Sequence, residues 1–160
     1  REAGFSIAPF NSVIYPYVKT GDIRFNSTLA KLNSADYTVS AVDGELAVFI
    51  AKEDFPLAKL NTLAQSSSYA EVFLNIINGK GDVSFNEPSA ANDFLKTNPG
   101  KIQKVGDTPV RSFGNSFAFT RDESSMISMW NVALGELIND GTITRILTKY
   151  NVSADYSLNK

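Results

Sequence analysis

Cysteine and histidine are both absent from the 160 residues of this chain. Without cysteine there are no disulfides, no thiolate nucleophiles and no cysteine-based zinc sites. Without histidine there are no Ser-His or Cys-His catalytic pairs, and the usual zinc triads and the commonest general base near neutral pH are missing as well. The two absences exclude most familiar hydrolase chemistry, and we expect no catalytic residue, no metal and no other cofactor.

An excess of basic residues and a long apolar run are also lacking. Fifteen Lys and Arg stand against 17 Asp and Glu, which gives a net charge of −2 and leaves no basic footprint for nucleic acid. The apolar stretch from Val132 to Ile138 is interrupted by Gly135 and Glu136, so no segment has the length of a membrane span. We therefore expect a soluble chain that does not bind nucleic acid.

A hydrophobic content of 43%, with 11% aromatic residues, is sufficient for one globular core. The chain begins at Arg1, with neither a starting Met nor an apolar signal segment, so we interpret it as processed or trimmed from a precursor with a signal peptide.

Strands and helices are predicted to alternate between residues 37 and 100. The predicted strands cover residues 37–42, 59–63 and 82–85, and the helices that follow them start near residues 46, 69 and 88. Ser68 and Glu71 form a capping-box pattern before an amphipathic stripe that runs from Tyr69 to Ile77. Because parallel strands need crossover connections, which are usually helices, the alternation predicts an α/β fold.

The two ends of the chain carry further elements. Residues 5–19 read as extended, and Pro16 suits an edge strand or a crossing segment. A strand is predicted over residues 112–120, followed by a long helix whose apolar stripe includes Trp130 and Leu134, and by a last helix after Gly141.

Polar residues recur where the predicted strands pass into helices. In open α/β sheets, ligands bind beyond the carboxyl ends of the strands, where loops enter helix N-termini that offer free amides. The candidate ligand-binding residues at these corners are Asp43, Gly44, Glu45, Ser66, Asn86 and Glu87. Three acids among them favour a cationic or amine-bearing ligand.

Each of these residues also has a purely structural interpretation. Asp43 could serve only as a helix N-cap, and Glu45 and Glu87 only as favourable charges near a first helical turn. Ser66 and Ser67 are also common turn and cap residues. Their recurrence at successive strand ends is the observation that favours a binding site.

Several segments carry a resemblance to a known family. They are Arg1–Phe10, with the pattern Arg-x-x-x-Phe-Ser-x-x-Pro-Phe, then Gly79–Val83, Asn98–Gly100, Phe113–Phe119, Asn139–Ile143 and Lys149-Tyr150. Together they resemble type 2 periplasmic binding proteins over nearly the whole chain. The likeness is greatest to the polar amino-acid binders of ABC transporters, the extracellular solute-binding protein family 3.

This resemblance implies a three-layer α/β lobe with a mixed, mainly parallel sheet flanked by helices. Residues 20–110 would form the second ligand-binding lobe, and residues 1–19 and 111–160 would be crossing and return segments of the first lobe. Much of that first lobe precedes Arg1 in the family, so the chain resembles a fragment. We expect it either to be completed by another chain, through association or domain swapping, or to pack its return segment differently.

The resemblance also implies non-catalytic capture of a small polar solute, an amino acid or another amine-bearing compound, for an ABC importer. The transporter's membrane subunits would be partners, and the protein would be periplasmic or extracellular, secreted or lipid-anchored. The family's Gly-Thr/Ser step maps to Gly44-Glu45, and its amine-binding acid maps to Glu87. Glu45 places a negative charge where the family has a hydroxyl beside the ligand carboxylate, which disfavours an ordinary α-amino acid.

Two other functions stay open. Glu45 and Glu87 could act as an acid and base pair, because the same fold hosts a few dehydratases. We nevertheless expect no enzyme, since acids at helix starts are more often caps or binding groups. The chain could also be a ligand-sensing module of a receptor or cell-wall enzyme, which a transmembrane segment outside it would favour.

Overall fold

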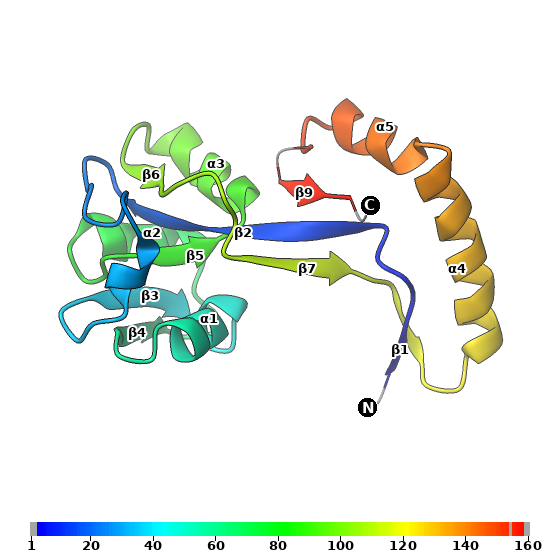
Figure 1. Cartoon of the computed structure of the whole chain (residues 1–160), viewed down its shortest axis with the longest axis horizontal. Helices are drawn as coiled ribbons and strands as arrows, with labels where there is room; N and C mark the ends of the chain where they lie inside the picture. Colours follow the sequence, from blue (N-terminus) through cyan, green and yellow to red (C-terminus); the bar gives the residue numbers. More distant parts are fainter. Residues whose placement is uncertain (1–2, 154, 159–160) are drawn as a thin grey trace. The chain divides into compact units, whose positions relative to one another are not determined.

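The computed structural model describes residues 3–153 and 155–158, so Arg1 of the family-like N-terminal segment lies outside the described part. The chain forms two compact units: unit 2 comprises Ile14–Val110, and unit 1 comprises the described residues of 1–13 and 111–160 (Figure 1). Strand β2, Phe10–Lys19, begins in unit 1 and continues into unit 2. Ile14 is therefore the first residue of unit 2 in this division.

The sheet of unit 2 is mixed. Strands β3, Thr38–Val42, and β4, Lys59–Leu63, run parallel. A parallel bridge between Val39 and Val83 joins β3 to the segment that leads into β5, Ser84–Asn86. Strand β2 pairs antiparallel with β5 on one side and with β6, Ile102–Lys104, on the other. The strands of unit 2 therefore follow the order β4, β3, β5, β2, β6.

Helices cover both faces of this sheet. On one face of the sheet, an apolar cluster joins Ile14 and Val18 of β2 to helix α1, Leu46–Asp54. The other joins Tyr17 of β2 to helices α2, Tyr69–Ile77, and α3, Pro88–Thr97. Successive side chains of a strand point to opposite faces, so the alternation along β2 supplies both clusters. The three-layer α/β arrangement predicted from the sequence is confirmed.

Pro16 was expected in an edge strand or a crossing segment, and β2 is not an edge strand of unit 2 but continues into it from unit 1, in agreement with the second alternative. The carbonyl of Pro16 accepts from the amide of Val105 at 2.9 Å, on the β6 side of β2. The nitrogen and carbonyl of one residue face the same side of a strand, and β6 ends at Lys104. An N–H at Pro16 would therefore point past the last residue of β6, so its absence removes no hydrogen bond between β2 and β6.

Unit 1 contains short strands and two helices. Strand β1, Ala3–Phe5, pairs antiparallel with β8, Ala118–Thr120, whereas β7, Arg111–Asn115, and β9, Tyr156–Ser157, pair with β2. The predicted single strand over residues 112–120 is thus two strands with different partners. The chain changes partner at Phe117, whose amide donates to the Ser6 hydroxyl at 2.9 Å.

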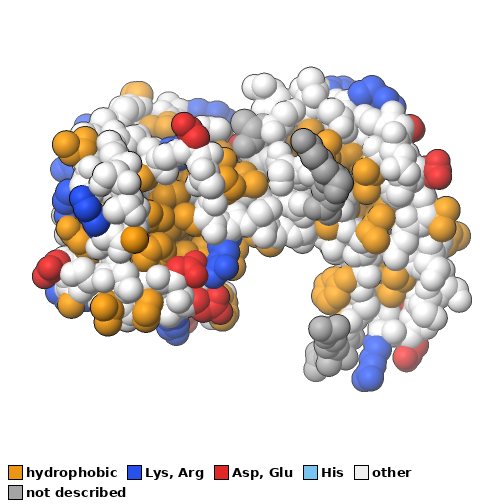
Figure 2. All heavy atoms as spheres, viewed as in Figure 1, with side chains coloured by type: hydrophobic (Ala, Val, Ile, Leu, Met, Phe, Trp, Pro, Cys, Tyr) orange, Lys and Arg blue, Asp and Glu red, His pale blue; other side chains and the backbone are white. Residues whose placement is uncertain are grey.

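The helices of unit 1 bury little apolar surface. They are α4, Ser124–Asn139, and α5, Thr142–Lys149. Leu134 is the one buried residue of α4, whereas Trp130 is 37% exposed beside Phe117. Apolar side chains are visible on the surface over α4 (Figure 2). Among the helices of the described residues, none combines the length and apolar character needed to cross a bilayer.

Candidate functional site

Three strands of unit 2 end at one edge of the sheet. In the parallel pair β3 and β4, Val42 lies opposite Leu63. The parallel bridge between Val39 and Val83 shows that β5, which follows Val83, runs in the same direction as β3. The segments that leave these strands, residues 43–45, 64–69 and 86–87, are called the carboxyl edge below. Helices α1, α2 and α3 begin there, as the strand-to-helix pattern predicts.

Gly44 brings the first two corners into contact. Its φ of +79° lies in the left-handed region, and a Cβ added there would lie 3.2 Å from Nε2 of Gln65. The amide of Asp43 also donates to the carbonyl of Leu63 at 2.9 Å. Glycine is favoured at this position because it permits both the backbone conformation and the close approach of the 64–69 segment.

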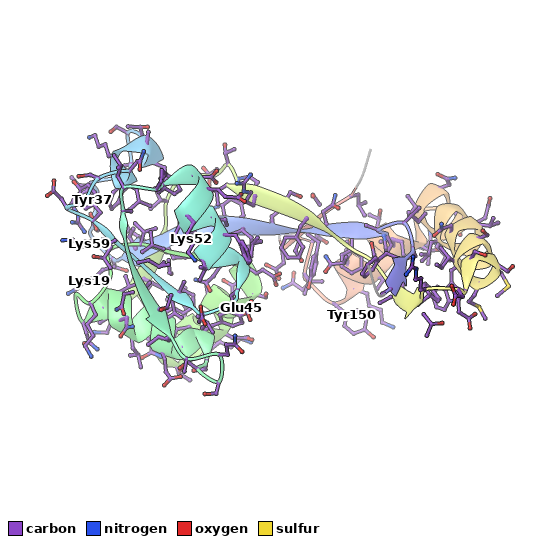
Figure 3. All side chains as sticks on the ribbon, turned by 90° about the horizontal axis from the view of Figure 1, so that it is seen from below. Lys19, Tyr37, Glu45, Lys52, Lys59 and Tyr150 are labelled. Atoms are coloured by element: carbon purple, nitrogen blue, oxygen red, sulfur yellow. The ribbon has the colours of Figure 1, made fainter. Side chains whose placement is uncertain are left out.

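Glu45 and Glu87 face one hydroxyl group. Each is the N-cap of its helix, α1 and α3 respectively, and neither side chain caps its own helix (Figure 3 labels Glu45 at the start of α1). Partial burial, the charges of both carboxylates and a hydrogen bond to Glu45 all raise the pKa of the Tyr69 hydroxyl. Acids from two helices and the first residue of a third therefore converge at the carboxyl edge.

The other predicted site residues are placed differently. Asn86 is 6% exposed and donates through Nδ2 to Ser84 Oγ at 3.0 Å, so it lies beneath the edge rather than open on it. Asp43 and Ser66 are exposed. Within the described residues, no hydrogen bond or ion pair links either of them to Glu45 or Tyr69.

A cavity of about 280 Å³ adjoins Tyr69 between helices α2 and α3. Its lining consists of small, aromatic and polar side chains: Tyr69, Ala70, Ala90, Asp93, Phe94 and Thr97. The sequence pattern assigned Tyr69 only to the apolar stripe of α2 and did not identify it as a site residue. Its position directly after the capping-box serine, at a strand-to-helix corner, is the signal that could have identified it.

The charge at the carboxyl edge is of one sign. The segments 43–45, 64–69 and 86–87 contain three carboxylates and no Lys or Arg. No group of three or more acidic side chains within residues 3–153 and 155–158 is arranged to hold a metal ion. The arrangement is suited to hold a positively charged organic group, because a carboxylate forms strong charge-assisted hydrogen bonds with an ammonium or guanidinium donor.

Comparison with known proteins finds amino-acid-binding proteins among the similar proteins. No protein-family model matches the chain. The ABC transporter arginine-binding protein 1 of Escherichia coli (strain K12) is 32% identical over 82 residues, which cover 49% of this chain and 34% of that protein. An ABC transporter binding component from Wolinella succinogenes, complexed with lysine, has a TM-score of 0.76 at 20% identity.

Two further structures are similar over most of the chain. An ancestral amino acid-binding protein, described as a precursor of cyclohexadienyl dehydratase, has a TM-score of 0.72 at 22% identity over 92% of this chain. An amino acid ABC transporter substrate-binding protein from Streptococcus pneumoniae, bound to L-arginine, has a TM-score of 0.69 at 19% identity over 99% of this chain.

The chain is shorter than all of these proteins. It spans 34% of the curated relative and between 61% and 63% of the three structures, of which the Wolinella protein is matched over 62% of its length. Identities below 25% in the structures establish likeness of fold. The chain therefore has the fold of the type 2 periplasmic binding proteins, and over 82 residues its sequence is similar to that of an arginine-binding protein of an ABC transporter.

Proposed function

We propose that unit 2 is a ligand-binding lobe that captures a small amine-bearing solute at the carboxyl edge, without catalysis, as part of the binding component of an ABC importer. The observation that carries this proposal is that Glu45 and Glu87 begin two helices at the carboxyl edge, whose segments contain no Lys or Arg. It is supported by the relatives, whose names describe binding of arginine or lysine.

Glu87 is the proposed main partner of the ligand amine. Its side chain is half-buried, and within the described residues its carboxylate makes no hydrogen bond or ion pair. A charge-assisted hydrogen bond to an ammonium group is roughly twice as strong as a neutral one. Gly44 would allow the ligand to approach the backbone closely at the adjoining corner. Asp43, Ser66 and Asn86 would contribute less to ligand binding than Glu87.

The membrane subunits of the transporter are the proposed protein partners, and the proposed location is periplasmic or extracellular. The support is that the relatives are named as binding components of ABC transporters, and that a further structural neighbour from Bacillus subtilis is named an extracellular-binding protein. Unit 1 would represent crossing and return segments of the other lobe. The proposal includes both a secreted protein and one attached to the membrane by a lipid anchor.

Catalysis is the second candidate, and one comparison favours considering it. The ancestral neighbour is described as a precursor of cyclohexadienyl dehydratase, but that protein is itself named an amino acid-binding protein. Glu45 and Glu87 would be the acid and base of such a reaction. We assign them to binding because both acids lie at helix starts, where carboxylates are common binding groups.

The test is a nuclear magnetic resonance titration of the whole ¹⁵N-labelled chain with L-lysine, L-arginine and L-glutamine, which detects weak as well as tight binding. Amide signals should shift at residues 43–45, 66–69 and 86–87. Glu87→Gln keeps the shape and removes the charge, so it should weaken binding by about 1.5–3 kcal/mol. Its free energy of unfolding should stay nearly unchanged.

Glu136→Gln is the matched control, because Glu136 is an exposed acid of α4 in unit 1. It should bind each ligand as the parent chain does. Absence of shifts with all three amino acids, or shifts confined to other parts of the chain, would refute the proposed site. If Glu87→Gln binds the ligands as tightly as the parent chain does, Glu87 serves only as a charge at the start of α3.

A further inference from the structure

A second cavity of unit 2, of about 320 Å³, lies at the opposite end of the sheet from the carboxyl edge. It is lined by residues of two segments, 19–24 and 79–82, called the amino edge below, and by Ile76 of α2. Asp82 belongs to this lining and accepts from the amide of Thr38, the first residue of β3, whereas the carboxyl edge begins where β3 ends. The cavity is therefore separate from the proposed amine site.

The acceptor groups of the amino edge are already engaged by donors of the protein. Both carboxylate oxygens of Asp22 accept from Arg24, through Nε and Nη2 of its side chain. Oδ1 of Asp82 accepts from the same Nη2, and Oδ2 accepts from a backbone amide at 2.8 Å. The carbonyls of residues 74–76, at the end of α2, accept from the amides of residues 78–80. A cation entering the cavity would have to displace these donors.

Several donor groups of the amino edge, in contrast, have no acceptor. Within residues 3–153 and 155–158, no hydrogen bond or ion pair engages the Lys19 ammonium, the Thr20 hydroxyl or Nη1 of Arg24. Gly81 is buried, yet its amide has no partner among the same residues. Buried N–H groups without a partner are rare, because each costs free energy comparable to a lost hydrogen bond. The unused hydrogen-bonding capacity of the cavity therefore suits an anion.

Positive charge also exceeds negative charge at this end of the sheet. Segments 19–24 and 79–82 contain three cationic side chains and two carboxylates. A fourth cation, Lys101, is adjacent, because its carbonyl accepts from an amide of segment 19–24 at 3.1 Å. The carboxyl edge contains three carboxylates and no Lys or Arg, and Figure 3 shows Lys19 and Glu45 at different ends of unit 2. The local field thus favours an anion at the amino edge.

Segment 19–24 is held in position without a ligand. Gln103 of β6 accepts through Oε1 from the amide of Gly21 at 3.1 Å and donates through Nε2 to the carbonyl of Asp22 at 2.9 Å. Asp22 and Asp82 in turn fix the guanidinium of Arg24. Donors that are already ordered lose less conformational entropy when a ligand binds.

We propose that the amino edge is a second binding site of unit 2, which takes a phosphate group, either as inorganic phosphate or as a phosphate monoester. Phosphate is favoured over a carboxylate because the acids occupy Nε and Nη2 of Arg24, so no bidentate edge of the guanidinium remains for a planar carboxylate. The free donors belong to four residues, 19, 20, 24 and 81, and the several oxygens of a phosphate can accept from all of them.

The experiment titrates the whole ¹⁵N-labelled chain with inorganic phosphate, with glycerol 3-phosphate and with acetate, at constant ionic strength so that charge screening stays the same. Amide signals of segments 19–24 and 79–82 should shift, that of Gly81 most, and signals of the carboxyl edge should not. Phosphate should bind at least about threefold more tightly than acetate. Tighter binding of glycerol 3-phosphate than of phosphate would identify a monoester as the preferred ligand, and the reverse order would identify the free ion.

Substitutions of Lys19 test the site without disturbing the fold, because its side chain is exposed and makes no internal ion pair within the described residues. Lys19→Met should weaken phosphate binding about fivefold, and Lys19→Glu should abolish it by adding a negative charge to the lining. Lys149→Met makes the same charge change at an exposed lysine of α5 in unit 1 and should bind phosphate as the parent chain does.

Three results would overturn the inference. They are the absence of shifts with both phosphate compounds, equal losses in Lys19→Met and Lys149→Met, which would indicate attraction to net charge alone, and acetate binding as tight as that of phosphate. None of these probes carries an amine, so they do not test the proposed function. A chain that responds to phosphate at the amino edge but to no amino acid would refute the proposed function and leave this site standing.

Discussion

Arg24 holds two carboxylates near the starts of β3 and β5, whereas the carboxyl edge lies at the ends of these strands. Its Nη2 lies 2.6 Å from Oδ2 of Asp22 and 2.7 Å from Oδ1 of Asp82. The second oxygen of Asp82 accepts from the amide of Thr38 at 2.8 Å, where β3 begins. The guanidinium also lies 5.3 Å from the ring centroid of Tyr37, so one side chain ties three segments together.

Removing this cation should make unit 2 less stable and less sensitive to acid. The hydrogen bond from Arg24 lowers the pKa of Asp22 below its ordinary value of 3.8. A carboxyl with a depressed folded-state pKa stabilises the fold above its ordinary pKa, and that contribution is lost as the pH falls through the folded-state value. Arg24→Met should therefore cost about 1 kcal/mol at pH 7, a figure reduced for solvent screening, and less at pH 2.

Urea unfolding of parent and variant at the two pH values measures the difference. Lys96→Met is the control, because the Lys96–Asp93 pair is exposed, with side chains 73% and 74% accessible. It should change the free energy of unfolding by less than about 0.5 kcal/mol. A loss of stability in Arg24→Met as large at pH 2 as at pH 7 would contradict this expectation.

At the scale of elements, the start of α2 depends on a local signal. The amide of Ser68 donates to Glu71, and three of the nine residues of the helix are buried, including Phe73 in the sheet-covering cluster. Ser68→Ala should therefore lower the free energy of unfolding by about 1 kcal/mol, since an N-cap serine is lost. Thermal unfolding followed by circular dichroism measures this.

Ser67→Ala, one residue earlier, is the matched control and should have a smaller effect, because Ser67 lies outside the capping box. A second consequence concerns the site. Because Tyr69 follows the cap directly, Ser68→Ala should also bring the pKa of Tyr69 closer to its ordinary value as the helix start loosens. Equal stability of both variants would show that the cap contributes little here.

Elements with strong local signals could be predicted from the sequence, and elements decided by distant partners could not. The capping box and Pro88 at the first position of α3 place both helices close to their observed starts. The strand over residues 112–120 was predicted as one element because its composition is uniform. Its division follows from pairing of β7 with β2 and of β8 with β1, which no local pattern reveals.

The candidate site shows the same division. Strand-to-helix corners predicted Glu45 and Glu87, because acids at helix starts are visible in the sequence. Tyr69 fits the helical apolar period as well as Val72 and Phe73 do, so periodicity alone assigned it to the core. Only the arrangement of three helix starts around the carboxyl edge shows that its hydroxyl faces two acids.

At the scale of the whole molecule, apolar burial differs between the two units. Unit 2 contains two clusters of buried side chains around its sheet, whereas no comparable cluster is found in the described residues of unit 1. Helix α4 has one buried residue in sixteen. Exposed apolar residues of unit 1 include Phe5, Met129 and Val132, at 61%, 61% and 70%.

Native-state hydrogen exchange should reflect this difference. Regions with few buried apolar contacts open locally at lower free energy, so amides in the middle of α4 should exchange at least about tenfold faster than those of α1 or α2. The measurement is made on the parent chain over a range of protein concentrations. Similar protection of α4 and α2 at the lowest concentration would contradict the expectation, and protection of α4 that rises with concentration would indicate self-association over its apolar surface.

The course of β2 also determines when the protein can finish folding. Strand β2 ends at Lys19, but its partners lie at residues 84–86, 102–104, 111–115 and 156–157. During synthesis β2 therefore leaves the ribosome before any of the strands that pair with it. Pairing over such sequence distances slows folding and prolongs the exposure of strand edges. We expect a slow, late closing step in refolding, and the greatest risk of aggregation while β2 lacks these partners.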